Sequence, residues 1–317
     1  MNSDPLPTPG HPLRLGTRAS PLAMAQAAQA VAALVAAHGL DPAALEIVPI
    51  TATGDKIQDR ALAEVGGKAL WTRELDAMLD AGVIDAAVHS LKDVETIRDA
   101  RFALAAMLPR ADARDRLVVR EGVAARTIAD LPPGARLGTS SPRRAAQVRA
   151  LRPDLQTPLL RGNVATRLAK LAAGDYEATL LAAAGLERLG MHDIGFAQPP
   201  DILLPAASQG AIGLECRADD ARAVALLASV DDAPTRRAVA AERAFLAALG
   251  GDCSSPVAAH ARLLADGTLR LAGAIYSEDG GDHVAGEAPV AGDADAAALA
   301  QRLLADAPET VRRLFAA

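Results

Sequence analysis

The chain carries two cysteines in very different settings, and one of them could react with a ligand. Cys253 lies within residues 250–256, a stretch of Gly, Asp, Ser and Pro that predicts an exposed loop. Cys216 ends an apolar stretch, so we expect a small, inert, half-buried side chain there. Two cysteines are too few for a disulfide framework. Cys253 could therefore reach a ligand, with an ordinary loop residue as the alternative.

A carboxylate in a second segment could assist the loss of an amine. Ser90, Lys92 and Asp93 follow an apolar, strand-like stretch that ends near His89. At the carboxyl end of a strand, Asp93 could stabilise a developing cation and exchange a proton with a leaving amine. A surface charge pair formed by Lys92 and Asp93 is an equally good interpretation of the pattern alone. We expect His89 to be a packed strand residue and not a ligand.

Arginines gather at predicted strand-to-helix turns, although the net charge of the chain is −6. Arg18 is placed at the first such turn, Arg143 and Arg144 at the second, and Arg161 and Arg167 at a third. Free backbone N–H groups at helix starts attract anions, and guanidinium groups pair well with carboxylates. This pattern predicts a polycarboxylate or phosphate ligand. Solvated arginines on helix surfaces are the alternative.

A repeated strand–turn–helix pattern must position these side chains. Residues 13–17 resemble a strand and precede Ser20, Pro21 and an Ala-rich helix that Gly39 would end. The pattern recurs at residues 137–139, followed by Ser141 and Pro142. Residues 80–88 and 173–181 form a second matching pair. We therefore predict two similar α/β lobes with largely parallel sheets and a ligand-binding cleft between them.

The predicted domain boundaries follow from this repeat. Residues 211–214 resemble a strand that returns to the first lobe, and a different pattern begins after Asp232. The predicted domains are a disordered leader at 1–12, a first lobe at 13–108 and 206–228, a second lobe at 109–205, and a smaller α+β domain at 229–317.

Composition and spacing exclude several classes of protein. The acidic net charge argues against a general nucleic-acid or anionic-membrane binder. We expect no apolar run long enough to span a membrane, no signal peptide, and hence a cytoplasmic protein. The six histidines are scattered, so we expect no metal. Gly66-Gly67-Lys68 is followed by Ala69 and does not form a nucleotide P-loop. It suggests instead a mobile flap beside the site.

Six segments, in this order and spacing, resemble the hydroxymethylbilane synthase (porphobilinogen deaminase) family. They are residues 16–23, 65–68, 87–94, 138–144, 160–164 and 208–211. The resemblance extends from about residue 13 to 256 and implies two lobes of the periplasmic-binding-protein type, a central cleft and a C-terminal domain. It departs from the common family pattern at Glu64 and Trp71, which puts contacts near the flap in doubt. The Trp71 indole could still stack on a pyrrole.

The resemblance also implies a cofactor and roles for individual residues. Cys253 would hold a dipyrromethane through a thioether, and Asp93 would be the catalytic carboxylate that assists loss of ammonia from porphobilinogen. The cofactor would further contact Ser90, Lys92, Asp93, Thr139, Ser141, Arg143, Arg144, Arg161, Arg167 and Gln209. The substrate would contact Arg18, Ser20, Arg161, Arg167 and Arg188.

The implied reaction joins four porphobilinogen molecules, after which water releases hydroxymethylbilane and the dipyrromethane stays. The implied protein is a monomeric transferase of tetrapyrrole (heme) biosynthesis, with no nucleic-acid or membrane partner. Two alternatives remain from other classes. One is a non-catalytic two-lobed polycarboxylate-binding protein, which would need no Cys253. The other is a ligand-sensing regulatory module, but no helix-turn-helix pattern stands out in the sequence.

Overall fold

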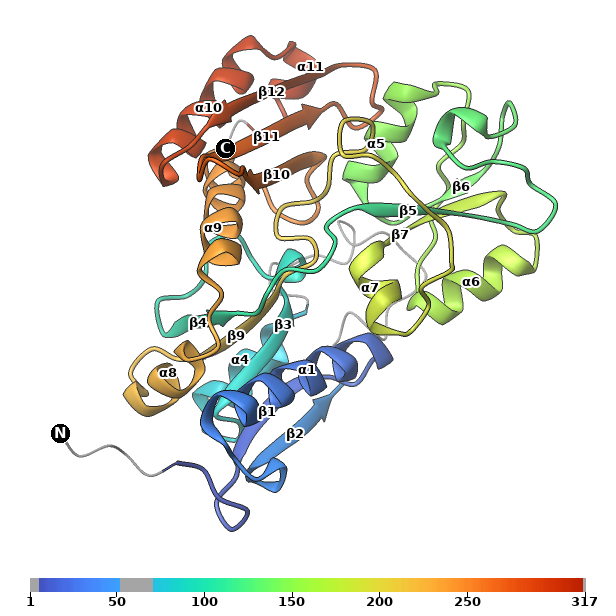
Figure 1. The fold of residues 1–317 in the computed structure, drawn as a ribbon. Coiled ribbons are helices and arrows are strands. Elements are labelled where there is room, and N and C mark those ends of the chain that lie inside the picture. Colours follow the sequence, from blue (N-terminus) through green and yellow to red (C-terminus); the bar gives the residue numbers. More distant parts are fainter. Residues whose placement is uncertain (1–5, 52–70, 316–317) are drawn as a thin grey trace. The chain divides into compact units, whose positions relative to one another are not determined.

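The structure is a computed structural model that describes residues 6–51 and 71–315. These residues form two compact units (Figure 1). The first unit contains residues 6–51, 71–110 and 211–236, and the second contains 111–210 and 237–315. The second unit holds two separate sheets, so the predicted second lobe and C-terminal domain share one unit.

The first unit is built around a five-stranded sheet with the order β2-β1-β3-β9-β4. The strands are β1 (Leu13–Arg18), β2 (Leu45–Ile50), β3 (Ala86–Ser90), β4 (Phe102–Met107) and β9 (Ile212–Arg217). β1 pairs in parallel with β2 and β3, and β9 is antiparallel to β3 and β4. The predicted return of the chain near residue 211 is therefore confirmed. The sheet is mixed, however, because β9 runs opposite to both of its neighbours. An antiparallel strand needs no crossover helix to pair in this way.

Helices cover this sheet. They are α1 (Pro21–His38), α4 (Arg73–Asp80) and α8 (Ala221–Ala228), with short 3₁₀ turns η1 (Pro42–Ala44) and η2 (Leu91–Asp93). The predicted end signals of α1 are all present. The Ser20 side chain accepts a hydrogen bond from the Ala23 amide, Pro21 is the first helical residue, and Gly39 adopts the left-handed conformation with φ 62°.

α1 is also long and apolar enough, by length and composition alone, to cross a membrane. The expectation that no such run exists was therefore wrong, because residues 19–40 carry no Asp, Glu, Lys or Arg. In the structure one face of this helix packs against the sheet. Ala27, Ala30 and Leu34 of α1 pack in one cluster with Leu15 of β1 and Val88 of β3. The small alanine side chains let the helix lie close to the sheet.

The second unit contains a four-stranded sheet with the order β6-β7-β5-β8. Its elements are β5 (Asp115–Val119), η3 (Ile128–Asp130), β6 (Leu137–Gly138), α5 (Pro142–Leu151), α6 (Val164–Ala172), β7 (Ala178–Ala182), α7 (Ala183–Arg188) and β8 (Phe196–Ala197). β6 and β7 are parallel, whereas β5 is antiparallel to β7 and β8. This sheet is mixed like the first.

The predicted repeat between the two lobes is present at the level of single residues. Ser141 caps α5 as Ser20 caps α1, again with Pro at the start of the helix. A Cβ atom on Gly16 of β1 would lie 2.4 Å from Ile84 Cδ1, and one on Gly138 of β6 would lie 2.7 Å from Tyr176 Cδ1. Both glycines therefore allow the same close approach between a strand and the turn that leads into its neighbour.

The C-terminal part of the second unit is an α+β layer, as the sequence predicts. An antiparallel sheet joins β10 (Val257–Leu263), β11 (Leu269–Tyr276) and β12 (His283–Pro289). The helices are α9 (Ala233–Ala248), α10 (Asp293–Asp306) and α11 (Glu309–Arg312), and α10 lies beside this sheet in Figure 1. Phe245 of α9 is fully buried and packs with Leu271 and Leu299.

Part of the predicted disordered leader is an ordered turn. Thr8 and His11 exchange two backbone hydrogen bonds of 3.2 and 2.9 Å. Pro9 and Gly10 lie between them, and this pair is a strong turn former. For residues 8–11 the expectation of disorder is therefore wrong, because the Pro-Gly turn orders these residues. Residues 1–5 lie outside the described ranges.

Candidate active site

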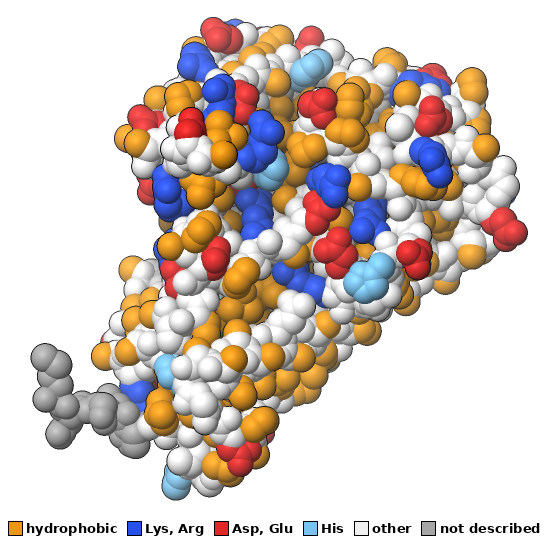
Figure 2. Space-filling view, viewed as in Figure 1, with side chains coloured by type: hydrophobic (Ala, Val, Ile, Leu, Met, Phe, Trp, Pro, Cys, Tyr) orange, Lys and Arg blue, Asp and Glu red, His pale blue; other side chains and the backbone are white. Residues whose placement is uncertain are grey.

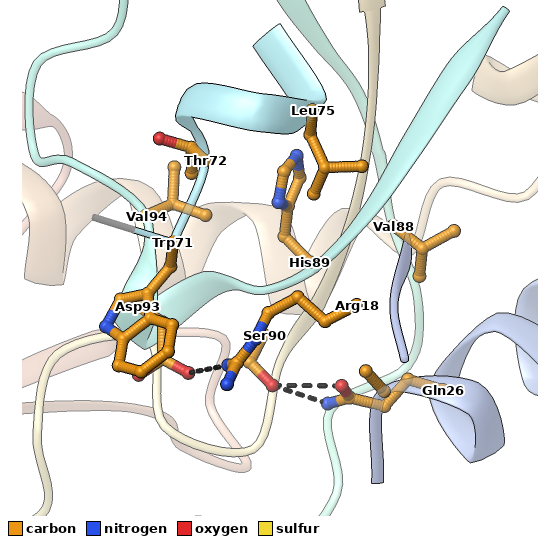
Figure 3. A pocket seen from close by; sticks show the side chains of 11 residues that line it. Arg18, Gln26, Trp71, Thr72, Leu75, Val88, His89, Ser90, Asp93 and Val94 are labelled. Carbon is orange, nitrogen blue, oxygen red and sulfur yellow. Dashed lines mark hydrogen bonds and ion pairs between the residues drawn. The ribbon is translucent and has the colours of Figure 1, made fainter. Parts of the chain in front are cut away.

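A pocket opens in the first unit at the carboxyl ends of β1 and β3 (Figure 3). In α/β sheets this edge is where ligands bind. Three segments supply its lining: the β1–α1 turn, the start of α4, and the end of β3 with η2. The lining residues are Arg18, Ala23, Gln26, Trp71, Thr72, Leu75, Val88, His89, Ser90, Asp93 and Val94.

Arg18, Trp71 and Asp93 meet at one side of this pocket (Figure 3). The guanidinium carbon of Arg18 lies 4.0 Å from the centroid of the Trp71 ring, a cation–π arrangement. Arg18 Nη1 lies 4.0 Å from Asp93 Oδ2, and the two side chains are 22% and 34% exposed. The pocket thus offers a cation, an anion and an aromatic face within reach of one small ligand, and the structure brings together two residues predicted from sequence.

Ser90 lies deeper in the pocket and pairs with a residue that sequence reasoning missed. Gln26 Nε2 lies 2.7 Å from Ser90 Oγ, and Ser90 Oγ lies 3.0 Å from Gln26 Oε1 (Figure 3). Gln26 is 4% exposed although it lies within the apolar helix α1. A polar side chain on the buried face of an Ala-rich helix was the available signal. Lys92 is half-buried in η2, and the Ser20 hydroxyl caps α1.

His89 lies on β3, buried as predicted, against an acidic residue of β9. Its Nε2 atom is 3.2 Å from Glu215 Oε2, and the two side chains are 4% and 1% exposed. Burial alone would raise the pKa of Glu215, but His89 and Arg98 outweigh it and lower that pKa to about 2. Glu215 is therefore a buried carboxylate kept ionised by two partners.

In the second unit, Arg143 and Arg144 share one buried carboxylate. Arg143 Nη2 donates to Asp115 Oδ2 over 2.9 Å, and Arg144 Nη2 donates to Asp115 Oδ1 over 2.6 Å. Gln209 Nε2 donates to the same Oδ1 atom over 2.8 Å. Asp115 has no exposed surface, and the arginines are 3% and 5% exposed. Sequence reasoning identified both arginines and Gln209 but missed Asp115, the residue that joins them.

Positive charge exceeds negative charge among the paired side chains of this cluster. Two guanidinium groups face one carboxylate, which leaves an excess positive charge in a buried place. Burial lowers the pKa of Arg143, and the neighbouring Arg144 lowers it further against the opposing effect of Asp115. The Nε atoms of Arg143 and Arg144 are buried and have no hydrogen-bond partner in the described part of the chain. A carboxylate ligand would offset the excess charge.

The other predicted arginines of this unit lie near turns and helix starts. Arg167 of α6 donates to the Gly162 carbonyl over 2.9 Å and to Ser140 Oγ over 3.3 Å. Arg161 is 5% exposed. Arg188 donates to the Gly210 carbonyl over 2.8 Å, and burial lowers its pKa.

Two further polar residues shape these turns. Asn163 caps α6 by accepting from the Thr166 amide. The Thr139 hydroxyl accepts from the amide of Ser141 over 3.2 Å and thus orders the turn before α5. Asn163 therefore holds the start of α6 and Thr139 orders the turn that leads into α5, whereas α7 begins without a side-chain cap among the described residues.

The two cysteines differ as predicted, and more sharply. Cys253 is exposed in its loop, whereas Cys216 on β9 is completely buried and not half-buried. Burial raises the pKa of the Cys216 thiol to about 12, so that thiol stays protonated and inert. Asp252 Oδ1 accepts from the Ser254 amide over 2.8 Å and from the Ser254 hydroxyl over 2.6 Å. These bonds shape the loop that presents Cys253.

Charge on the surface is mixed. Figure 2 shows acidic and basic side chains interspersed on the face drawn, in keeping with the small net charge of −6. Within residues 6–51 and 71–315, no three His, Cys, Asp or Glu side chains gather in a way that could hold a metal ion. Glu64 and the predicted flap at residues 66–68 lie outside the described residues.

Comparison with known proteins supplies the family. Residues 13–225 match the model for "Porphobilinogen deaminase, dipyromethane cofactor binding domain", and residues 236–308 match "Porphobilinogen deaminase, C-terminal domain". A porphobilinogen deaminase of Sphingopyxis alaskensis is 76% identical over 98% of this chain and 99% of its own length. That of Paracoccus denitrificans is 49% identical over 96% and 97%, respectively.

Likeness to solved structures is much weaker than likeness in sequence. The periplasmic VFT2 domain of Bordetella pertussis BvgS has a TM-score of 0.40 and 15% identity, covering 69% of this chain and 86% of that one. The family follows from the sequence matches, which span nearly the whole chain. The chain therefore belongs to the porphobilinogen deaminase family, the dipyrromethane-dependent transferases that make hydroxymethylbilane for tetrapyrrole biosynthesis.

Proposed function

We propose that this chain condenses four porphobilinogen molecules into hydroxymethylbilane with Cys253 as the attachment residue for the dipyrromethane and Asp93 as the catalytic carboxylate. The observation that carries the proposal is the contrast between the two thiols. Cys253 is exposed, whereas Cys216 is buried and has a pKa raised to about 12. Only the first can reach a pyrrole and form a thioether through its thiolate.

The donor set of the second unit fits the acetate and propionate groups of a dipyrromethane. Arg143 and Arg144 carry an excess positive charge beside Asp115, and their Nε groups are buried donors. The residues proposed to hold the cofactor are Ser90, Lys92, Asp93, Thr139, Ser141, Arg143, Arg144, Arg161, Arg167, Gln209 and Cys253. When bound, the dipyrromethane supplies the pyrrole carbon to which the first new ring is joined.

Gln209 has an indirect part in this set. Its Nε2 atom donates to Asp115 Oδ1 over 2.8 Å and to the Ala113 carbonyl over 2.7 Å. That amide nitrogen is therefore already engaged by the protein. We propose that Gln209 orients the Asp115 carboxylate, and that Asp115 in turn orients Arg143 and Arg144.

Arg18 and Asp93 have different proposed roles, the first in binding the substrate and the second in catalysis. The Arg18 guanidinium binds a carboxylate of porphobilinogen, and the Trp71 ring holds that guanidinium from one side. The amino nitrogen of the aminomethyl group leaves as ammonia, the methylene carbon stays on the ring, and the Asp93 carboxylate stabilises the cation that remains on the substrate. Arg18 lies 4.0 Å from Asp93, so both groups can act on one ring. The proposed substrate contacts are Arg18, Ser20, Arg161, Arg167 and Arg188.

Several broader properties belong to the same proposal. We assign the domains to residues 13–108 with 206–228, 109–205 and 229–317. The protein is proposed to be a cytoplasmic monomer that binds neither nucleic acid nor membrane. The net charge of −6 supports the last point, and the packing of α1 against β1 and β3 supports a role for that helix in the core.

The test is the intact mass of the purified protein beside two variants, Cys253→Ser and Cys216→Ala. We expect a mass excess of two linked pyrrole units in the parent and in Cys216→Ala, and no excess in Cys253→Ser. If the parent carries no excess, it is incubated with porphobilinogen or with hydroxymethylbilane. Failure of both to load it would favour the non-catalytic polycarboxylate-binding protein.

A further inference from the structure

One arginine beside the pocket joins acidic side chains from three parts of the first unit. Arg98 lies in the loop between η2 and β4, and its side chain is 12% exposed. It bonds Glu215 of β9 through Nε at 2.8 Å and Nη2 at 2.6 Å. It bonds Asp76 of α4 through Nη2 at 2.7 Å, and Glu95 through Nη1 at 2.8 Å. Two planar pairs of this kind fix the guanidinium more firmly than a single contact would.

The carboxylates outweigh the cost of burying this cation. Burial lowers the pKa of Arg98, but the hydrogen bonds that it donates to Glu215 and Asp76 raise that pKa well above its ordinary value. The three carboxylates are themselves largely buried, with exposed fractions of 20% for Asp76, 18% for Glu95 and 1% for Glu215. Removing Arg98 would therefore leave negative charges close together at low exposure.

A short chain of contacts leads from Arg98 to the pocket. Thr72 donates from Oγ1 to Glu95 Oε1 over 2.6 Å, while Glu95 Oε2 accepts from Arg98. Thr72 is 1% exposed, lines the pocket and is the residue before α4. Its neighbour in sequence is Trp71, whose ring contacts the Arg18 guanidinium at 4.0 Å. Figure 3 shows Thr72 and Trp71 leading from the start of α4 to the Arg18–Asp93 side of the pocket.

We propose that Arg98 is a positioning residue for the reaction, which acts through Glu95 and Thr72 to hold Trp71 against Arg18 beside Asp93. The proposal rests on the assignment of Arg18 and Asp93 to the substrate site. Arg98 does not line the pocket, so it acts on the reaction through its neighbours, and Glu95 and Thr72 link it to Trp71. A purely structural Arg98 would stabilise the fold without influencing the position of the indole.

The protein provides its own reporter, because Trp71 is the only tryptophan in the chain. The experiment measures tryptophan emission and its quenching by acrylamide, without porphobilinogen, in the holoenzyme and in Thr72→Val, Thr72→Ser and Arg98→Met. The kcat and KM for porphobilinogen are then measured in the same preparations. Arg101→Gln is the matched control, because Arg101 is a neighbouring arginine that is 60% exposed and pairs with Asp80 and Asp99 at the surface.

We expect Thr72→Val and Arg98→Met to shift the Trp71 emission and to increase quenching. Their KM should rise by about tenfold, the size expected from loss of one hydrogen bond to a charged group. Thr72→Ser restores the hydroxyl and should bring emission and KM back toward the parent values. Arg101→Gln should leave both unchanged.

Parent-like emission and KM in folded Thr72→Val would overturn the proposal, and so would a Thr72→Ser variant that fails to restore them. Thr72→Val also decides the matter if Arg98→Met does not fold. An inactive parent would count against the proposed function instead. The emission of Trp71 would still test the coupling in that case, since it needs no turnover.

Discussion

Arg144 donates to Asp115 over 2.6 Å in a place where neither side chain is more than 6% exposed. The same carboxylate accepts from Arg143 over 2.9 Å, so one anion serves two cations. Asp115 is the first residue of β5, and both arginines lie in the first turn of α5. Asp115 thus allows two arginines to be buried at a proposed carboxylate-binding site. Replacing Asp115 and replacing Arg143 should therefore have different effects, the first on stability and the second on binding.

Replacing Asp115 with Ala should destabilise the protein strongly. Two buried guanidinium groups would lose their shared partner, and breaking a buried pair of this kind costs about 3–5 kcal/mol. The matched control is Asp112→Ala, which removes a surface pair with Arg114, whose side chain is 46% exposed. That change should cost less than about 1 kcal/mol. Thermal denaturation of both variants measures the difference, and equal midpoints would contradict it.

Replacing Arg143 with Leu should affect cofactor loading more than stability. Asp115 would keep Arg144 as a partner, so one cation would face one anion and the cluster would become neutral. The excess positive charge proposed to attract the cofactor would be lost. We expect a folded protein with a reduced mass excess in the intact-mass experiment. Full loading with unchanged kinetics would exclude a role for Arg143 in holding carboxylates.

Local signals in the sequence predicted the elements around the site. Ser20 with Pro21, and Ser141 with Pro142, specify where two helices begin, because a cap and a fixed φ act within one turn of chain. The matching glycines Gly16 and Gly138 follow from the same repeat. The contrast between the two cysteines was likewise visible from their neighbours in sequence. Such features depend on residues a few positions apart.

Long-range partners could not be predicted in this way. Asp115 lies 28 and 29 residues from its arginines, and Glu215 lies 117 residues from Arg98. No spacing rule links such positions, because the sheet order brings them together. The mixed sheets were missed for the same reason, since β9 joins β3 only after the whole stretch from β4 to residue 211 has intervened. Gln26 was missed, although it is polar on an otherwise apolar buried face, because its partner Ser90 lies 64 residues away in sequence.

Replacing Asp93 with Ala should leave the fold intact and reduce turnover severely. The side chain is 34% exposed and lies 4.0 Å from Arg18, so its removal leaves no buried charge without a partner. Loss of one preorganised electrostatic group lowers kcat by about 10²–10³-fold. Single-turnover release of ammonia from porphobilinogen measures the effect, with the thermal midpoint as a check on folding. Full activity in the variant would refute the role assigned to Asp93.

Stability in acid should depend on Glu215. Its pKa falls from 4.5 to about 2 in the folded protein, so its contribution is complete above about pH 4.5 and is lost as the pH falls toward 2. At about 1.4 kcal/mol per pH unit, the contribution amounts to a few kcal/mol. Asp76 acts in the opposite sense, because burial raises its pKa despite Arg98, and its protonation in acid favours the folded state.

We therefore expect the thermal midpoint of the parent to fall more steeply between pH 4.5 and 2 than that of Glu215→Gln. The variant should also be less stable at neutral pH, because Arg98 and His89 lose an ionised partner. Glu46→Gln is the control, since Glu46 is an exposed residue of β2 in the same sheet. It should keep the slope of the parent. Parallel curves for the parent and Glu215→Gln would show that acid unfolding begins at other carboxylates, and that the Arg98 cluster persists when Glu215 is protonated.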